Sequence, residues 1–149
     1  STPNIQVWHQ TGEKLFDEAS QSWSQVDHQP YRLAPFIENM AEAYEWADII
    51  VCRAGALTLA ELTAVGLGSI LIPLPTAVDD HQRKNAEFLV SSDAAYCINE
   101  RSYDHDALVQ ILNDLTLERC LKMAENARNN AKPNAVDEIV ETIVSAFSR

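Results

Sequence analysis

An arginine, a glycine and a threonine follow an apolar run in the middle of the chain, in DIIVCRAGALTLAE. Arg53 carries a planar set of N–H donors that matches a phosphate group. Gly55 allows the backbone to bend or to approach a ligand closely. Ala56, Leu57 and Thr58 lie where the strand gives way to a helical pattern, whose first N–H groups and positive dipole end attract an anion. These residues predict a site for a phosphate or diphosphate.

A simpler interpretation of the same residues needs no ligand. Thr58-Leu-Ala-Glu61 has the T-x-x-E spacing of a capping box, in which the two side chains satisfy N–H groups at the start of a helix. In that case Gly55 serves only the turn, and Arg53 is a solvated residue at the end of a strand. Both interpretations remain open on these residues alone.

A second polar cluster follows the next apolar run, in PLPTAVDDHQRKNAEFL. Asp79 or Asp80 caps the helix predicted there, and His81, Gln82 and Asn85 fall in its first turns. Gln82 and Asn85 are three residues apart and therefore share one face of the helix. Neutral donors and acceptors beside a carboxylate suit sugar hydroxyls, although an ordinary polar helix start has the same composition.

An aromatic residue ends a third apolar run, in YRLAPFIEN. An exposed Phe36 there would stack on a nucleotide base, whereas a buried Phe36 would belong to the core. Ile37 follows it directly.

The elements that position these residues alternate between strands and helices. Apolar runs rich in β-formers predict strands at Ile5–Gln10, Tyr31–Phe36, Asp48–Arg53, Ser69–Pro73 and Ala95–Asn99. Helical patterns cover Glu13–Val26, Asn39–Ala47, Leu57–Val65, Asp80–Ser91, Asp104–Leu115, Leu117–Asn130 and Ala135–Phe147. The alternation predicts one α/β domain with a Rossmann-like, doubly wound parallel sheet, whose ligands bind beyond the carboxyl ends of the strands. The runs IIVC and ILI are nearly all apolar, which indicates strands covered on both faces.

Composition excludes several classes of function. The formal net charge of −11 argues against a nucleic-acid or anionic-membrane surface. The three cysteines, Cys52, Cys97 and Cys120, form no C-x-x-C pair, and the four histidines have no metal-ligand spacing, so we expect no disulfide and no metal site. No apolar run reaches the roughly 20 residues of a membrane span. We therefore expect a cytoplasmic α/β domain.

The motifs WHQTG, R-A-G-A-L-T-L-A-E and D-D-H-Q-R-K-N-A, at this spacing, resemble the C-terminal half of the MurG family, from about Val7 to the C-terminal helices. These bacterial enzymes have the two-domain GT-B architecture of glycosyltransferase family 28. They transfer N-acetylglucosamine from UDP-N-acetylglucosamine to undecaprenyl-pyrophosphoryl-MurNAc-pentapeptide, which converts lipid I to lipid II. The resemblance implies that this chain is the domain that binds the donor.

The resemblance also implies a role for each candidate residue. Phe36 and Ile37 flank the uracil, Ile37 through its main chain, and Glu61 accepts from the ribose hydroxyls. The remaining candidates divide between the diphosphate and the sugar: Arg53, Gly55, Ala56, Leu57 and Thr58 for the first, and His81, Gln82 and Asn85 for the second. The family often has a serine where this chain has Ala54, and it varies at the position of His81. No metal or other cofactor is expected from the sequence, so Arg53 and helix N-termini would meet the charge of the leaving diphosphate.

The family's C-terminal domain opens with a strand, a glycine-rich turn and a helix that precede the WHQTG strand. We expect this chain to lack them, together with the N-terminal domain that holds the catalytic histidine, the lipid I acceptor site and the membrane contact. The resemblance thus assigns no catalytic residue to this chain and implies that the fragment alone is inactive. The whole enzyme would lie peripherally on the cytoplasmic face of the inner membrane. An exposed sheet edge would favour a dimer.

Other functions fit the same residues. One is a different GT-B enzyme that uses a UDP-sugar, such as an epimerase, which would share the uridine side of the site. Another is a non-catalytic nucleotide-binding subunit of a split transferase. A third is a purely structural domain.

Overall fold

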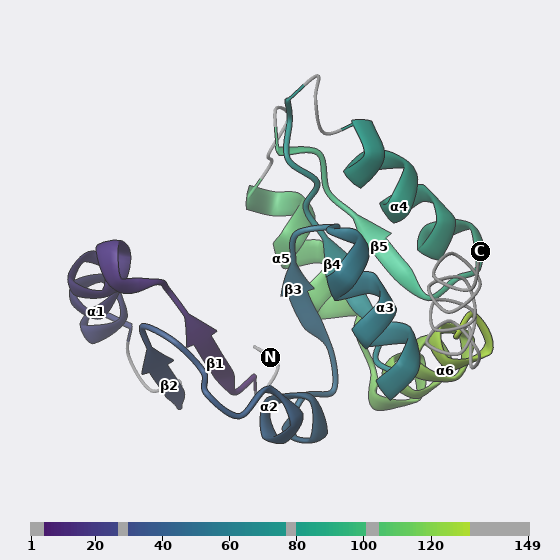
Figure 1. Ribbon diagram of the computed structural model, residues 1–149. Coiled ribbons are helices and arrows are strands. Elements are labelled where there is room, and N and C mark those ends of the chain that lie inside the picture. Colours follow the sequence, from purple (N-terminus) through teal and green to yellow (C-terminus); the bar gives the residue numbers. More distant parts are fainter. Residues whose placement is uncertain (1–4, 27–29, 77–79, 101–104, 132–149) are drawn as a thin grey trace, which may run out of the picture. The chain divides into compact units, whose positions relative to one another are not determined.

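The computed structural model describes residues 5–26, 30–76, 80–100 and 105–131. The chain divides into two compact units, residues 1–47 and 48–149, and each is described by itself. In both units parallel strands alternate with helices (Figure 1). The predicted Rossmann-like α/β class is therefore confirmed.

The first unit is built on two parallel strands, β1 (Val7–Gln10) and β2 (Tyr31–Ala34). Between them lie a short 3-10 turn, η1 (Glu13–Leu15), and helix α1 (Phe16–Ser24), and helix α2 (Met40–Trp46) follows β2. The guanidinium of Arg32 lies 5.1 Å from the ring of Trp8 and 5.6 Å from the ring of Trp46, which ties α2 to the sheet. Because the strands are parallel and in register, Gln10 and Ala34 end at the same edge.

The second unit is built on a three-stranded parallel sheet in the order β3-β4-β5, formed by Ile50–Cys52, Ser69–Leu71 and Ala95–Cys97. Its helices are α3 (Ala56–Val65), α4 (Asp80–Ser91), α5 (His105–Asp114) and α6 (Leu117–Asn129). Helix α3 packs against α4 and α6, and α4 packs against β5 (Figure 1). The residues that follow β3, β4 and β5 consequently share one edge of the sheet.

The core of the second unit surrounds its central strand. All of β4, Ser69–Leu71, is 0% exposed, as its continuous apolar pattern predicts for a strand covered on both faces. Strand β3 differs from that prediction, because Val51 is 47% exposed. Among the described residues, β3 is an outer strand of this sheet and pairs with β4 alone, which leaves one side of the strand uncovered.

Most element boundaries lie close to the prediction. Helix α4 has the predicted bounds, while the strands are shorter than predicted. Strand β2 ends at Ala34 because Pro35 has no N–H to donate to a ladder. The helix predicted at Glu13–Val26 is divided into η1 and α1. The helix predicted at Ala135–Phe147, and Asp79 as a helix cap, lie outside the described residues.

Candidate functional site

The turn between β3 and α3 begins the candidate site in the second unit. Helix α3 starts at Ala56, and Gly55 is its N-cap, with φ −67° and ψ 144°. Thr58 is therefore the third residue of the helix, and the predicted capping box at Thr58 and Glu61 is wrong. The turn lies earlier because it is anchored at Ala54, whose side chain is fully buried. Gly55 has no side chain to accept from the first N–H groups of the helix, and these groups face the end of the sheet.

The fold itself does not require a glycine at position 55. A φ of −67° is open to every L-residue. A Cβ added to Gly55 would meet only the Thr58 Oγ1, at 3.8 Å, an ordinary contact. The interpretation of Gly55 as a turn glycine thus loses its basis, whereas close approach of a ligand to the backbone still gives a glycine a purpose.

The first turns of α3 present a mixed face to solvent. Leu57 is 75% exposed, Glu61 is exposed and Thr58 is half-buried. Glu61 follows Leu57 by four residues and Thr58 by three, so the three side chains share one face of the helix. An exposed leucine beside a carboxylate at the end of a sheet is an arrangement that suits the ring and hydroxyls of a sugar or ribose.

Arg53 forms a two-pronged ion pair that the sequence did not reveal. Its Nη1 and Nη2 donate to the two carboxylate oxygens of Glu100 at 2.8 and 2.9 Å, and Nη1 also donates to the carbonyl of Ile72 at 3.2 Å. The side chain thereby crosses from the end of β3 past β4 to the segment after β5. The guanidinium has five N–H groups, and these bonds use its Nη1–Nη2 end, so its Nε side can still meet an anion. The interaction with Arg53 holds the pKa of Glu100 below its usual range and raises the pKa of Arg53, so the pair is ionised at neutral pH.

The second predicted cluster is joined to the first by a hydrogen bond. Asn85 donates its Nδ2 to the carbonyl oxygen of Ala54 at 3.1 Å, which fastens α4 to the β3–α3 turn. Gln82 accepts the backbone N–H of Leu74 at 3.2 Å, which fastens α4 to the segment after β4. The structure therefore brings Arg53, Gly55, Gln82 and Asn85 to one edge of the second unit. Neither of these two bonds uses the side-chain oxygen of Asn85 or the side-chain nitrogen of Gln82. His81 is exposed at the start of α4.

The remaining two candidates belong to the edge of the first unit. Phe36 is 66% exposed, so the interpretation of this residue as core is wrong, and its ring face is open to stacking. Ile37 is buried, at 8% exposed, and donates its backbone N–H to Gln10 Oε1 at 2.8 Å. The backbone N–H groups of Thr11 and Gly12 donate to the carbonyls of Ala34 and Pro35 and hold the two strand ends together.

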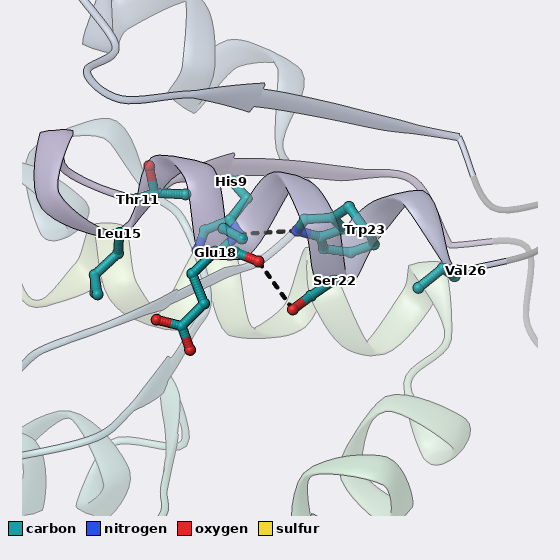
Figure 2. Close-up of a pocket in the computed structure, with 8 residues that line it drawn as sticks. His9, Thr11, Leu15, Glu18, Ser22, Trp23 and Val26 are labelled. Carbon is teal, nitrogen blue, oxygen red and sulfur yellow. Dashed lines mark hydrogen bonds between the residues drawn. The ribbon is translucent and has the colours of Figure 1, made fainter.

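A separate pocket of about 360 Å³ lies in the first unit, and Figure 2 shows the side chains around it. In it the Nε1–H of Trp23 donates to Nδ1 of His9 at 3.0 Å, which fixes the proton of the neutral imidazole on Nε2. None of the predicted site residues contributes to the lining, which consists of His9, Thr11, Leu15, Glu18, Ala19, Ser22, Trp23 and Val26.

The described part of the chain contains no group of His, Cys, Asp or Glu side chains suited to a metal ion. Cys52, Cys97 and Cys120 are free thiols, and burial raises the pKa of Cys52 to about 11. Within the described ranges no helix is both long and apolar enough to span a membrane.

The model of the glycosyltransferase family 28 C-terminal domain matches residues 1–143. The chain belongs to this family. The predicted resemblance to MurG is also confirmed. A protein of Xanthomonas oryzae pv. oryzae (strain MAFF 311018), named UDP-N-acetylglucosamine–N-acetylmuramyl-(pentapeptide) pyrophosphoryl-undecaprenol N-acetylglucosamine transferase, is 47% identical over 144 residues, which cover 95% of this chain and 32% of the relative. A protein of the same name from Dechloromonas aromatica (strain RCB) is 45% identical over 136 residues, which cover 91% of this chain and 38% of the relative.

A solved structure agrees with this membership of the family, and a second one shares the fold. The crystal structure of Acinetobacter baumannii MurG superposes with a TM-score of 0.88 at 35% identity, over 94% of this chain and 43% of that one. The glycotransferase of kitacinnamycin superposes with a TM-score of 0.54 at 18% identity, over 91% of this chain and 42% of that one, and so shares the fold. The family 28 chain spans about a third of the length of the curated relatives that it matches.

Two polar residues at the strand ends were missed by sequence reasoning, Glu100 and Gln10. Gln10 ends β1 in the first unit, and Glu100 follows β5 in the second unit, so each lies at the carboxyl edge of its own sheet. That position was the available signal, because parallel strands carry their ligand-binding residues at their carboxyl ends.

Proposed function

We propose that this chain is the donor-binding C-terminal domain of an enzyme that transfers N-acetylglucosamine from UDP-N-acetylglucosamine to undecaprenyl-pyrophosphoryl-MurNAc-pentapeptide, in peptidoglycan synthesis. The observation that carries the proposal is the hydrogen bond from Asn85 to the carbonyl of Ala54, which joins the two motifs into one polar edge. The names of relatives 45–47% identical to this chain support the choice of donor and acceptor.

Each part of the donor has a candidate partner. The exposed ring of Phe36 and the main chain of Ile37 take the uracil, and Glu61 takes the ribose hydroxyls. Arg53, through its Nε side, and the backbone at Gly55, Ala56, Leu57 and Thr58 take the diphosphate. His81, Gln82 and Asn85 take the sugar, since Gln82 offers N–H donors there and Asn85 offers an oxygen acceptor.

The reaction of the whole enzyme would be an inverting transfer. The 4-hydroxyl oxygen of the muramyl sugar bonds to the anomeric carbon, the bond from that carbon to the diphosphate breaks, and the hydroxyl proton passes to a base. We assign no base to this chain. We propose that the base, the lipid I site and the contact with the cytoplasmic face of the inner membrane belong to the part of the relatives' length that this chain does not cover. A strand added beside β1 or β3, each an outer strand of its sheet, would complete the donor domain or pair two copies.

Nuclear magnetic resonance titrations of the chain with UDP-N-acetylglucosamine, UDP and GDP test the proposal. We expect saturable amide shifts confined to Ile37, to residues 53–61 and to residues 81–85, with both uridine ligands binding more tightly than GDP. Saturable shifts elsewhere, or equal affinity for UDP and GDP, would contradict the assignment of the site. If no ligand produces shifts, the titration is repeated with the preceding strand and glycine-rich turn restored, and a second failure would reject the proposal.

Two variants separate the uridine side from the sugar side. Glu61→Ala should weaken the binding of UDP and of UDP-N-acetylglucosamine by a similar factor, roughly ten- to a hundredfold, because loss of a hydrogen bond to a charged group costs about 1.5–3 kcal/mol. Gln82→Ala should reduce the affinity for UDP-N-acetylglucosamine more than the affinity for UDP. Glu87→Ala is the matched control, because Glu87 lies on α4 and pairs with Arg83 outside the site. Equal losses for both ligands in Gln82→Ala would remove this residue from the sugar site.

A further inference from the structure

A histidine joins strand β1 to helix α1 in the first unit. Nδ1 of His9 accepts the Nε1–H of Trp23 at 3.0 Å, and the two rings meet edge to face with their centroids 6.2 Å apart (Figure 2). An indole N–H can only donate, so this bond requires an imidazole whose Nδ1 carries no proton. The contact between His9 and Trp23 therefore exists only while His9 is neutral.

Trp23 also connects the same helix to the second strand. Its ring stacks on the ring of Tyr31 in β2, with the centroids 4.9 Å apart and an angle of 22° between the planes. Trp23 lies in the last turn of α1. One indole thus holds this end of the helix to β1 by a hydrogen bond and to β2 by a ring stack.

Protonation of His9 would break the hydrogen bond. Histidine is the side chain that ordinarily changes its charge between about pH 5 and pH 8. The imidazolium carries an N–H group on both ring nitrogens, so its Nδ1–H would face the Nε1–H of Trp23 and two donors would meet. The half-buried indole would then have to turn toward water to regain a partner.

The surroundings of His9 allow it to take up a proton. Its ring lines the pocket of about 360 Å³, a space that water can enter. Glu18, from α1, is the other charged side chain in the lining, and its carboxylate favours the charged imidazole. The turn η1 contributes Leu15, which does not ionise, and β2 contributes Tyr31, which packs on Trp23.

We propose that the contact between His9 and Trp23 is a pH-sensitive switch within the first unit. The neutral imidazole holds the end of α1 on the two strands, and the imidazolium formed as the pH falls toward about 5 releases Trp23 and loosens this end of the helix. The ladder between β1 and β2 consists of backbone bonds and stays intact. The inference does not rest on the proposed function, because none of the predicted site residues lines this pocket.

A pH titration of the isotope-labelled chain from about pH 8 to about pH 5, followed by nuclear magnetic resonance, tests the switch. We expect the ring nitrogens of His9 and the indole N–H of Trp23 to change together, with one midpoint. Amide protection in the last turn of α1, corrected for the intrinsic exchange rate, should fall roughly fivefold, because one hydrogen bond is lost. Trp8 and Trp46, whose rings pack on Arg32, are internal controls, and their indole signals should not change.

Two variants at position 9 separate the titration of His9 from its packing. His9→Asn offers an oxygen near the position of Nδ1 that accepts at every pH, so the response of Trp23 should disappear while α1 stays protected. His9→Leu has no acceptor, so Trp23 should show its low-pH signal throughout. His81→Asn removes an exposed histidine of the second unit and is the matched control, which should leave the response of Trp23 unchanged.

A shared midpoint for His9 and Trp23 that is lost in His9→Asn supports the inference. An indole signal of Trp23 that stays constant while His9 becomes charged overturns it. A His9 that is still neutral at about pH 5, or a response that persists in His9→Asn, overturns it as well. The wild-type titration is decisive even where a variant fails to fold, because it compares three tryptophans within one molecule.

Discussion

Replacing Gly55 with alanine should have a small effect on stability and a large effect on the binding of UDP. Position 55 has φ −67°, and its new Cβ would lie 3.8 Å from Thr58 Oγ1, so the folded chain can accept the methyl group without strain. The remaining cost is the poorer N-cap, since alanine is worse than glycine there by about 1 kcal/mol. For a chain of this length that corresponds to a melting temperature lower by about 2–4 °C.

The effect on binding should be much larger. A phosphate oxygen that accepts from the first N–H groups of α3 passes next to the Gly55 backbone, where the Cβ would sit. Loss of one hydrogen bond to a charged group costs about 1.5–3 kcal/mol, so UDP should bind on the order of ten- to a hundredfold more weakly. Uridine, which has no phosphate, should bind Gly55→Ala and the wild type alike.

Calorimetric titration of the wild type and of Gly55→Ala with UDP and with uridine tests the effect on binding, and thermal melts of the same two proteins test the effect on stability. Wild-type affinity for UDP in Gly55→Ala would refute the placement of the diphosphate at this turn. A large fall in melting temperature would refute the argument that the fold has no need of a glycine at position 55.

Two further predictions concern the ion pairs of the second unit. Glu100→Gln should strengthen the binding of UDP roughly three- to tenfold at low salt, because it removes a negative charge that shares the Arg53 guanidinium with the proposed diphosphate. The gain should shrink at high salt. Weaker binding of UDP, or an equal change for uridine, would show that Glu100 supports Arg53 instead of competing for it. Arg119 holds the pKa of Asp93 below its ordinary 3.8, so the stability from this pair is complete above that value and is lost as the pH falls through the lowered pKa. Asp93→Asn, which tolerates the left-handed φ of 59°, should therefore unfold at lower urea than the wild type at pH 6 and by a smaller margin at about pH 3. A urea difference that is the same at both pH values would contradict this role of Asp93.

The sequence by itself determined the class of fold and the family. Continuous apolar runs and the spacing of the motifs depend on residues near one another in the chain, which is why α4 and the central strand Ser69–Leu71 agree with prediction. The two motifs that carry the candidate site were also visible, because strand ends and helix starts are local features.

Only the tertiary structure decided what these residues touch. Arg53 meets Glu100, 47 positions away, and Gln10 meets Ile37, 27 positions away, and no local pattern encodes such pairs. The capping box at Thr58 failed for a related reason: the start of α3 is set by the burial of Ala54 and its bond to Asn85, which come from packing between α4 and the sheet. Local spacing specifies which residues can reach the edge of a sheet, and long-range packing decides which of their atoms remain for a ligand.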